Sequence, residues 1–466
     1  MTTQRNILWI TLDSVRADHT SLHGHHRRTT PNLERLANRP DARQFSQCLS
    51  HGVWTRPSTT SIFTGTPPSQ HNVVTFDSAL DDRFDTAAEL FARQGYHTAC
   101  LSRNPNLSSA TNLDRGFEDF AWLAASTLLE HAGPQTLLKY LLNIRRHSAG
   151  LTTDTNRHST AFLMNDLAKR WLARFEQRHE PFFFYLHYNQ PHRPYYPPRS
   201  YLDHFDDYDL STNEALEFAM DLDDDVFETV ATADSVTDEQ WEALEALYDA
   251  GIAYTDACIG RLLEYVRDLD LGETTIVVTG DHGELLGEDG LVGHRYVVDD
   301  AVVHVPCVVS GLPEIDHQDH SLVQHADLMR TLLELAGAPT DQFQGVDLRT
   351  GPRAYAFSQR SGAHARRGLA SIREHDPSFD HDRVDPSTLT GIRSDEFKYC
   401  ESEETAALYR LPDEGTDVSE THPVVRSELE AELTTWLEDV DGPSPAAGGS
   451  DLSPAVESSL RDMGYL

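Results

Sequence analysis

Three short segments, far apart in the sequence, carry side chains that could act together on an anionic ester. Asp13 follows one apolar run, and Asp281 and His282 follow a second. Thr55 stands directly before a segment with helical spacing. Carboxylates joined by a hydroxyl and an imidazole suit a hard divalent cation, which neutralises ester oxygens and lowers the pKa of a coordinated hydroxyl. The residue types therefore indicate a metal-assisted site for phosphoryl or sulfuryl transfer.

The hydroxyl of Thr55 is the candidate nucleophile. Pro57 is tolerated in the first turn of a helix, so Thr55 would stand at a helix N-terminus. Backbone N–H groups at such a terminus attract anions. A hydroxyl held by a cation and by this end of a helix would be placed for nucleophilic transfer.

The elements that must position these residues alternate along the first three quarters of the chain. Apolar runs predict buried strands at 6–12, 97–101, 181–187, 274–279 and 305–310. Helical spacing and capping residues predict helices at 30–37, 56–63, 85–94, 238–269 and 326–336. This order predicts an α/β fold, a mostly parallel sheet sandwiched by helices, with ligands beyond the carboxyl ends of the strands. The acidic stretch 200–235 is expected to be irregular.

The pattern changes near residue 345 to short pieces separated by Gly and Pro. We therefore predict a catalytic domain over 1–345 and a smaller C-terminal α+β subdomain over 346–466. Within it, 391–401 is expected to form one arm of a hairpin, 406–411 its return, and 427–437 a helix.

The chain is strongly acidic, with a formal net charge of −37 and only three lysines. This charge argues against binding nucleic acid or an anionic membrane surface. Acids spread over the whole chain with almost no Lys are typical of halophilic proteins, in which salt screens the repulsion. No apolar signal segment or membrane-spanning window is visible, and five scattered cysteines suggest no disulfide framework, so a cytoplasmic location is expected.

Several segments, taken in order, resemble the sulfatase family of the alkaline-phosphatase superfamily. They are 6–18, 55–58 continued by 63–65 and 68–71, 183–197, 275–284 and 293–306. The resemblance extends along nearly the whole chain. Its motifs are specific for the superfamily and much less so for the substrate.

The resemblance implies a role for each matching residue. It implies one divalent cation, Ca, Mg or Mn, held by Asp13, Thr55, Asp281 and His282, with Thr55 also the nucleophile. It implies catalytic roles for His192 and His294, and substrate binding by Arg56, His187 and Arg295. The substrate implied is a small-molecule or glycan- or lipid-linked anionic ester. The tract of His23, His25 and His26 matches no family ligand and is expected to be solvated.

Departures from the family pattern decide between sulfate and phosphate. Ser14 replaces the second acid of the opening motif, and Thr59 replaces an Arg. Sulfatases oxidise a Cys or Ser at the nucleophile position to formylglycine, and Thr55 cannot form that aldehyde. Phosphate esters are therefore the favoured substrates. Two alternatives stay open: a sulfatase in the strict sense, and a non-catalytic binding protein that keeps the fold.

Overall fold

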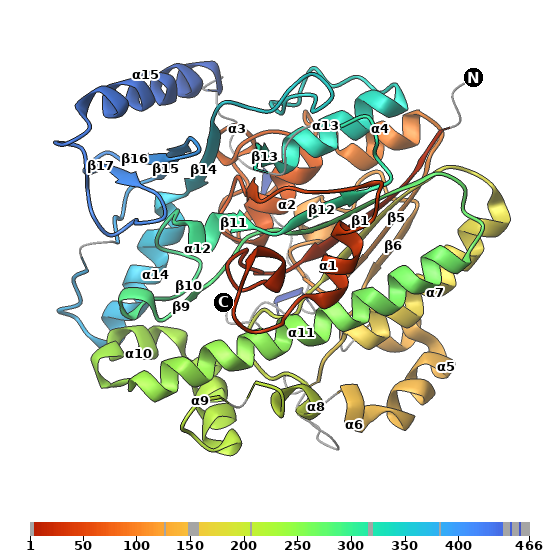
Figure 1. Cartoon of the computed structure of the whole chain (residues 1–466), viewed down its shortest axis with the longest axis horizontal. Helices are drawn as coiled ribbons and strands as arrows, with labels where there is room; N and C mark the ends of the chain where they lie inside the picture. The colour runs from red at the N-terminus through yellow and green to blue at the C-terminus, as the bar shows by residue number, and fades with distance from the viewer. Residues whose placement is uncertain are drawn as a thin grey trace.

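Seven strands form the central sheet of the computed structural model, in the order β2-β12-β8-β1-β7-β5-β6 (Figure 1). The structure describes residues 4–124, 127–147, 158–205, 207–315, 320–381, 384–440, 448–449 and 456–457. The strands are β1 Asn6–Leu12, β2 Ala42–Gln44, β5 His97–Ser102, β6 Asp119–Trp122, β7 Phe182–Tyr188, β8 Thr274–Gly280 and β12 Cys307–Ser310. From β8 to β6 the strands run parallel, whereas β12 pairs antiparallel with both neighbours. The predicted α/β class and mostly parallel sheet are confirmed.

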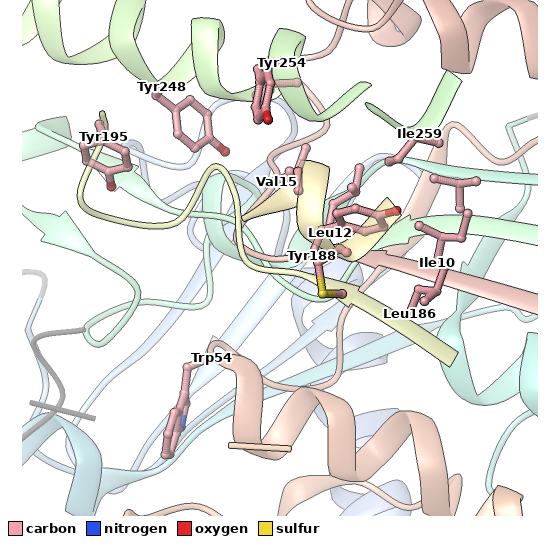
Figure 2. Packing of buried hydrophobic residues seen from close by; sticks show 14 of the residues in the cluster. Ile10, Leu12, Val15, Trp54, Leu186, Tyr188, Tyr195, Tyr248, Tyr254 and Ile259 are labelled. Atoms are coloured by element: carbon pink, nitrogen blue, oxygen red, sulfur yellow. The ribbon is translucent and has the colours of Figure 1, made fainter. Parts of the chain in front are cut away.

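Strand β1 is buried along its whole length because helices cover both faces of the sheet. Its alternate side chains enter two cores, with Leu8 and Ile10 in one and Ile7 and Trp9 in the other. The first core includes side chains of α1 Pro31–Ala37, α7 Ala161–Arg178 and α11 Asp238–Asp268, and the second includes side chains of α2 Thr55–Thr64, α4 Ala87–Arg93 and α13 His325–Ala336. Figure 2 shows part of the first core, where Ile259 of α11 lies over Ile10. A mostly apolar strand is the expected result of cover on both sides.

Shorter elements surround this framework. The strands are β3 Gln47–Leu49, β4 Ser78–Ala79, β9 Leu285–Leu286, β10 Val292–Gly293, β11 His304–Val305, β13 Leu322–Gln324 and β18 Gly448–Gly449. The helices are α3 Pro68–His71, α5 Leu128–Leu142, α6 Ile144–His147 and α12 Asp300–Val303. No helix in the described part of the chain is long and apolar enough to span a membrane.

A four-stranded antiparallel sheet forms the C-terminal subdomain. Its elements are β14 Ala356–Arg360, α14 Gly362–His375, β15 Leu389–Arg393, β16 Phe397–Glu401, β17 Ala406–Arg410 and α15 Pro423–Val440. Leu429 and Leu433 of α15 pack on Ile392, Tyr399 and Leu408 of the sheet, and Figure 1 shows α15 in blue above it. The predicted single arm at 391–401 is wrong, because the polar residues 394–396 form a turn and divide it into β15 and β16. The domain boundary at residue 345 stays a prediction.

The prediction of irregular structure at 200–235 is also wrong. The segment contains α8 Arg199–Leu202, α9 Thr212–Asp224 and α10 Val226–Ala231. Helix α9 begins with a capping box between Ser211 and Glu214, and it buries Ala215, Ala219 and Leu222 at helical spacing. The many acidic residues of the segment made this short apolar stripe difficult to recognise in the sequence.

A buried carboxylate fastens the loop before α1 to helix α11. Asp249 is fully buried, and its oxygens lie 2.8 Å from His19 Nδ1, from His25 Nε2 and from Arg27 Nη1. The side chain of His25 is only 10% exposed, so the prediction of a solvated tract is wrong for this residue. Burial opposes the charge of Asp249, but hydrogen bonds from His19 and His25 outweigh it and hold the pKa of this carboxyl well below its ordinary value. The carboxylate therefore stabilises the fold in its charged form.

We predict that Asp249→Asn lowers the free energy of unfolding by about 3 kcal/mol, because it leaves the largely buried guanidinium of Arg27 without its counter-charge. Urea denaturation at neutral pH measures the change. Since the pKa of Asp249 is lowered in the folded protein, its charge adds to the free energy of unfolding above about pH 4. This contribution is lost as the pH falls through the folded-state pKa of Asp249. Asp207 pairs with the same Arg27 but has a 56% exposed side chain, so Asp207→Asn should cost no more than about 1 kcal/mol. Equal losses in the two variants would contradict this reading.

Candidate active site

The carboxyl ends of β1 and β8 bring two aspartates together. Leu12, the last residue of β1, pairs with Tyr188 of β7 and Gly280 of β8. Asp13 and Asp281 therefore both lie just beyond the carboxyl ends of these parallel strands. The Asp281 amide donates to the Leu12 carbonyl at 3.3 Å. The chain then turns sharply at Ser14, where φ is 59°, and the Ser14 amide donates to Asp281 Oδ1 at 3.1 Å.

Helix α2 presents Thr55 to this pair. Thr55 is its first residue, and the side-chain oxygen Oγ1 lies 3.4 Å from Asp13 Oδ1 and 3.3 Å from His282 Nε2. The whole helix is buried although most of its residues are polar. Thr60 and Thr64 donate to carbonyls one turn earlier, and Ser58 donates to Gly52, which satisfies these hydroxyls internally. The helix can therefore lie inside the protein with its N-terminus at the site.

The ring of His282 is held in one orientation. Its Nδ1 lies 2.8 Å from the Gly283 carbonyl, so this nitrogen carries the proton and Nε2 carries the lone pair. That Nε2 lies 3.6 Å from Asp13 Oδ1 and 3.6 Å from Asp281 Oδ2. Metal-binding histidines commonly have this arrangement, in which a carbonyl fixes the far nitrogen.

Two buried carboxylates this close need a positive charge. Asp281 Oδ2 is buried and has no hydrogen-bond partner among the described residues. Burial raises the pKa of Asp281, whereas at Asp13 the same burial is outweighed by the His187 hydrogen bond and the pKa is lowered. Asp13, Asp281 and His282 offer ligand atoms within 4.8 Å of one another. Their donor types and the unpaired oxygen fit a divalent cation, with Thr55 as a further ligand.

Asn104 is a site residue that the sequence reasoning missed. Its side-chain amide donates to Asp13 Oδ2 at 2.6 Å and to Thr55 Oγ1 at 3.2 Å. It follows β5, just as Asp13 follows β1, and that position after a predicted strand was the available signal. His187, predicted to bind substrate, lies against the same carboxylate, with Nε2 3.1 Å from Asp13 Oδ2.

Two further histidines line the side of the site next to His282. The rings of His282 and His294 are 4.6 Å apart, and those of His192 and His294 are 5.7 Å apart. His294 Nδ1 lies 2.8 Å from Glu284 Oε1. Burial lowers the pKa of both His192 and His294. The structure thus brings both predicted catalytic histidines beside the predicted cation ligands.

The two arginines predicted to bind substrate lie differently. Arg56 donates from Nη1 to the carbonyls of Thr75 and Ser78, so its guanidinium holds the loop that follows α3. Arg295 lies over the rings of Phe76 and Phe227, at 5.6 and 5.4 Å from their centres. Their roles in binding substrate stay predictions.

Comparison with known proteins agrees with the fold. The model of the family described as Sulfatase matches residues 5–338. The chain therefore belongs to the sulfatase family of alkaline-phosphatase-like ester hydrolases.

Individual relatives are distant. The chain is 25% identical to an arylsulfatase of Clostridium perfringens over 312 residues, which cover 61% of this chain and 64% of that enzyme. It is 25% identical to a choline-sulfatase of Rhizobium meliloti over 401 residues, covering 78% and 76% of the two chains. Among solved structures, the phosphonate monoester hydrolase of Agrobacterium radiobacter has a TM-score of 0.72 at 23% identity, covering 94% of this chain and 96% of that one. That structural likeness concerns the fold.

We predict that Asp281→Asn weakens divalent-cation binding by at least about tenfold, because it removes a ligand charge. An amide Oδ1 can still accept the hydrogen bonds from Ser14 and His282, and the buried charge is gone. Stability in EDTA should therefore be unchanged or higher. Isothermal titration with Mn²⁺ and thermal melting in EDTA measure the two effects.

The matched control is Asp77→Asn, which removes the same charge from an exposed residue and should leave the affinity unchanged. A wild-type protein that takes up no divalent cation would favour the binding-protein alternative. A large loss of stability in EDTA would make Asp281 a structural residue.

Proposed function

We propose that this protein hydrolyses phosphorus esters carrying one negative charge, such as phosphodiesters and phosphonate monoesters, with Thr55 as the nucleophile. The observation that carries the proposal is the position of Thr55 Oγ1, which lies 3.3–3.4 Å from His282 and Asp13 at a helix N-terminus. The names of the relatives, sulfatases and a phosphonate monoester hydrolase, support ester hydrolysis in general.

Asp13, Thr55, Asp281 and His282 would hold one divalent cation. When bound, such a cation neutralises ester oxygens and lowers the pKa of the Thr55 hydroxyl. Asn104 donates to one lone pair of Oγ1 and so fixes the orientation of the nucleophile. The first-turn amides of α2 would bind an oxygen of the ester.

The reaction would proceed in two displacements at phosphorus. Thr55 Oγ1 forms a bond to phosphorus and loses its proton, while the bond to the alcohol oxygen breaks and that oxygen takes up a proton. Water then forms a bond to phosphorus and gives up a proton, while the bond from phosphorus to Thr55 Oγ1 breaks and Oγ1 takes up a proton. His192 and His294 lie where they could position the transferred group or protonate the leaving oxygen, as the sequence predicts.

The side chain of Thr55 favours phosphorus over sulfur. A formylglycine adduct releases sulfate by breaking its own C–O bond, and a threonine ester has no such route. A threonyl phosphate can be resolved by a second displacement of the same kind as the first. A threonyl sulfate would persist and stop the enzyme after one turnover.

A pocket beside the site could receive the alcohol part of the ester. It is lined by Arg103, Asn189, His192, Arg193, Tyr195 and Tyr196. Its mixture of polar and aromatic side chains suits a small alcohol or a sugar, and is consistent with the predicted small-molecule or glycan- or lipid-linked ester.

We predict that the chain turns over 4-nitrophenyl esters of methyl phosphate or phenylphosphonate faster than 4-nitrophenyl sulfate. Because the leaving group is the same in all these substrates, a difference in rate reports on the transferred group. The assay should contain molar KCl, which screens the repulsion caused by the net charge of −37. Thr55→Val, which keeps the shape without the hydroxyl, should lower kcat/KM by at least about a thousandfold. Thr55→Ser, which keeps the hydroxyl, should retain measurable activity.

Wild-type protein incubated with the aryl sulfate should show one burst of 4-nitrophenol and a sulfated Thr55 peptide in its mass spectrum. Many turnovers of the sulfate, faster than those of the phosphodiester and dependent on Thr55, would restore the strict sulfatase reading.

A further inference from the structure

Three arginines lie close together in the chain where helix α14 begins. Arg360 ends β14, and Arg366 and Arg367 lie in the second turn of α14. The first turn of α14 contains no acid, although the whole chain has 75 acidic residues against 38 basic ones. In the described part of the chain no carboxylate forms an ion pair with any of these arginines. Since a helix N-terminus is itself positive, positive charge accumulates here without a nearby counter-charge.

Arg360 is the buried member of this group. Its side chain is 0% exposed, and its Nη1 donates to the Ser387 carbonyl. Its Nε and Nη2 have no hydrogen-bond partner among the described residues. Burial lowers the pKa of Arg360 to about 10, so the guanidinium still carries its charge at neutral pH. Water and salt screen a buried charge only weakly, so Arg360 makes its surroundings more attractive to anions.

The start of α14 lies beside the proposed nucleophile. The ring of His364 stacks on the ring of Trp54, with their centres 4.7 Å apart, and Trp54 directly precedes Thr55. Burial and the charge of Arg295, with a smaller contribution from Arg367, hold the pKa of His364 well below its ordinary value. The ring is therefore neutral at pH 7, and the charges next to it are those of the arginines.

Two guanidinium groups share one aromatic ring at this wall of the site. Arg367 is exposed on α14, and its guanidinium lies 5.2 Å from the centre of the Phe76 ring. Arg295, which directly follows His294, lies 5.6 Å from the same centre. A Cβ atom on Gly368 would lie 3.7 Å from the Arg295 side chain, so α14 packs closely against the His294 segment. Like charges held this close together are offset when an anion binds, and guanidinium groups bind carboxylate and phosphate oxygens well.

We propose that Arg367, supported by the charge of Arg295, binds a second anionic group on the part of the ester that stays attached to phosphorus. The described residues that line the pocket for the alcohol part include none from α14, so this wall is left for the other substituent. A phosphodiester or a phosphonate monoester has such a second organic group, whereas a sulfate ester has none. The substrate would then carry a carboxylate, phosphate or sulfate in addition to the reacting group. This inference rests on the proposed function.

The test uses three 4-nitrophenyl esters that differ only in the group left on phosphorus. They are the esters of phenylphosphonate, 4-carboxyphenylphosphonate and the longer 4-(2-carboxyethyl)phenylphosphonate. The assay should contain the lowest KCl concentration that keeps the protein folded, because salt screens ion pairs. The net charge of −37 alone would disfavour the additional negative charge. We expect instead that kcat/KM for at least one carboxylate ester is about fivefold above that for the phenyl ester, the size typical of an accessible ion pair.

Arg367→Gln should bring this ratio down to about one. The matched control is Arg373→Gln, which removes the same charge from an exposed residue in the last turn of α14 and should keep the ratio. A wild-type ratio of one or below for both carboxylate esters, or a ratio that Arg367→Gln leaves unchanged, would overturn the second anion site. Thr55-dependent turnover of the phenyl ester would in that case leave the proposed function standing.

If no ester is turned over, isothermal titration with the three free phosphonates in the presence of Mn²⁺ tests binding alone. Tighter binding of a carboxylate-bearing phosphonate that is lost in Arg367→Gln would support the second anion site, although the proposed function would then fail. Equal binding of all three would overturn the site as well.

Discussion

Two carboxylates, Asp13 and Asp281, are buried side by side at the carboxyl ends of two central strands. The groups around them offset the free-energy cost of burying their charge. Asp13 accepts hydrogen bonds from Ser14 and Asn104 and lies 3.1 Å from His187. Asp281 accepts two backbone hydrogen bonds through Oδ1 and leaves Oδ2 unpaired among the described residues. Without a cation, burial favours the neutral form of Asp281, so the site is suited to take up a positive ion. The Thr55 hydroxyl lies where that ion would be held.

The rest of the fold fixes these groups in place. Strand β1 lies between β7 and β8, and its parallel register with both sets the depth of Asp13 against Asp281 and His187. A buried ionic network ties the C-terminal sheet to α12, which follows the His294 segment. In it, Lys398 lies 2.6 Å from Glu414 and 3.3 Å from Asp300. The C-terminal subdomain thus supports the part of the site that carries His294.

Much of this could be predicted from the sequence, because mostly apolar runs such as 6–12 leave few alternatives to a buried strand. The site residues that directly follow those strands could be predicted for the same reason. The order of the motifs along the chain predicted the family. Asn104 was missed because its contact depends on strand order: β5 lies beyond β7, so its end reaches Asp13 only in the folded sheet. Glu284 stood in a recognised motif, but its role depends on where His294 lies. The helices within 200–235 were missed because one to three buried apolar residues per helix are a weak signal among many acids.

The most direct test of the shared site is anomalous diffraction from crystals grown with Mn²⁺. We predict one strong peak within about 2.0–2.6 Å of Asp281 Oδ2, Thr55 Oγ1, His282 Nε2 and an oxygen of Asp13. The same crystals of Asp281→Asn should lose that peak. A map with no peak there at saturating Mn²⁺, and with Asp281 Oδ2 bonded to water instead, would contradict the central claim that a cation and Thr55 form one catalytic centre.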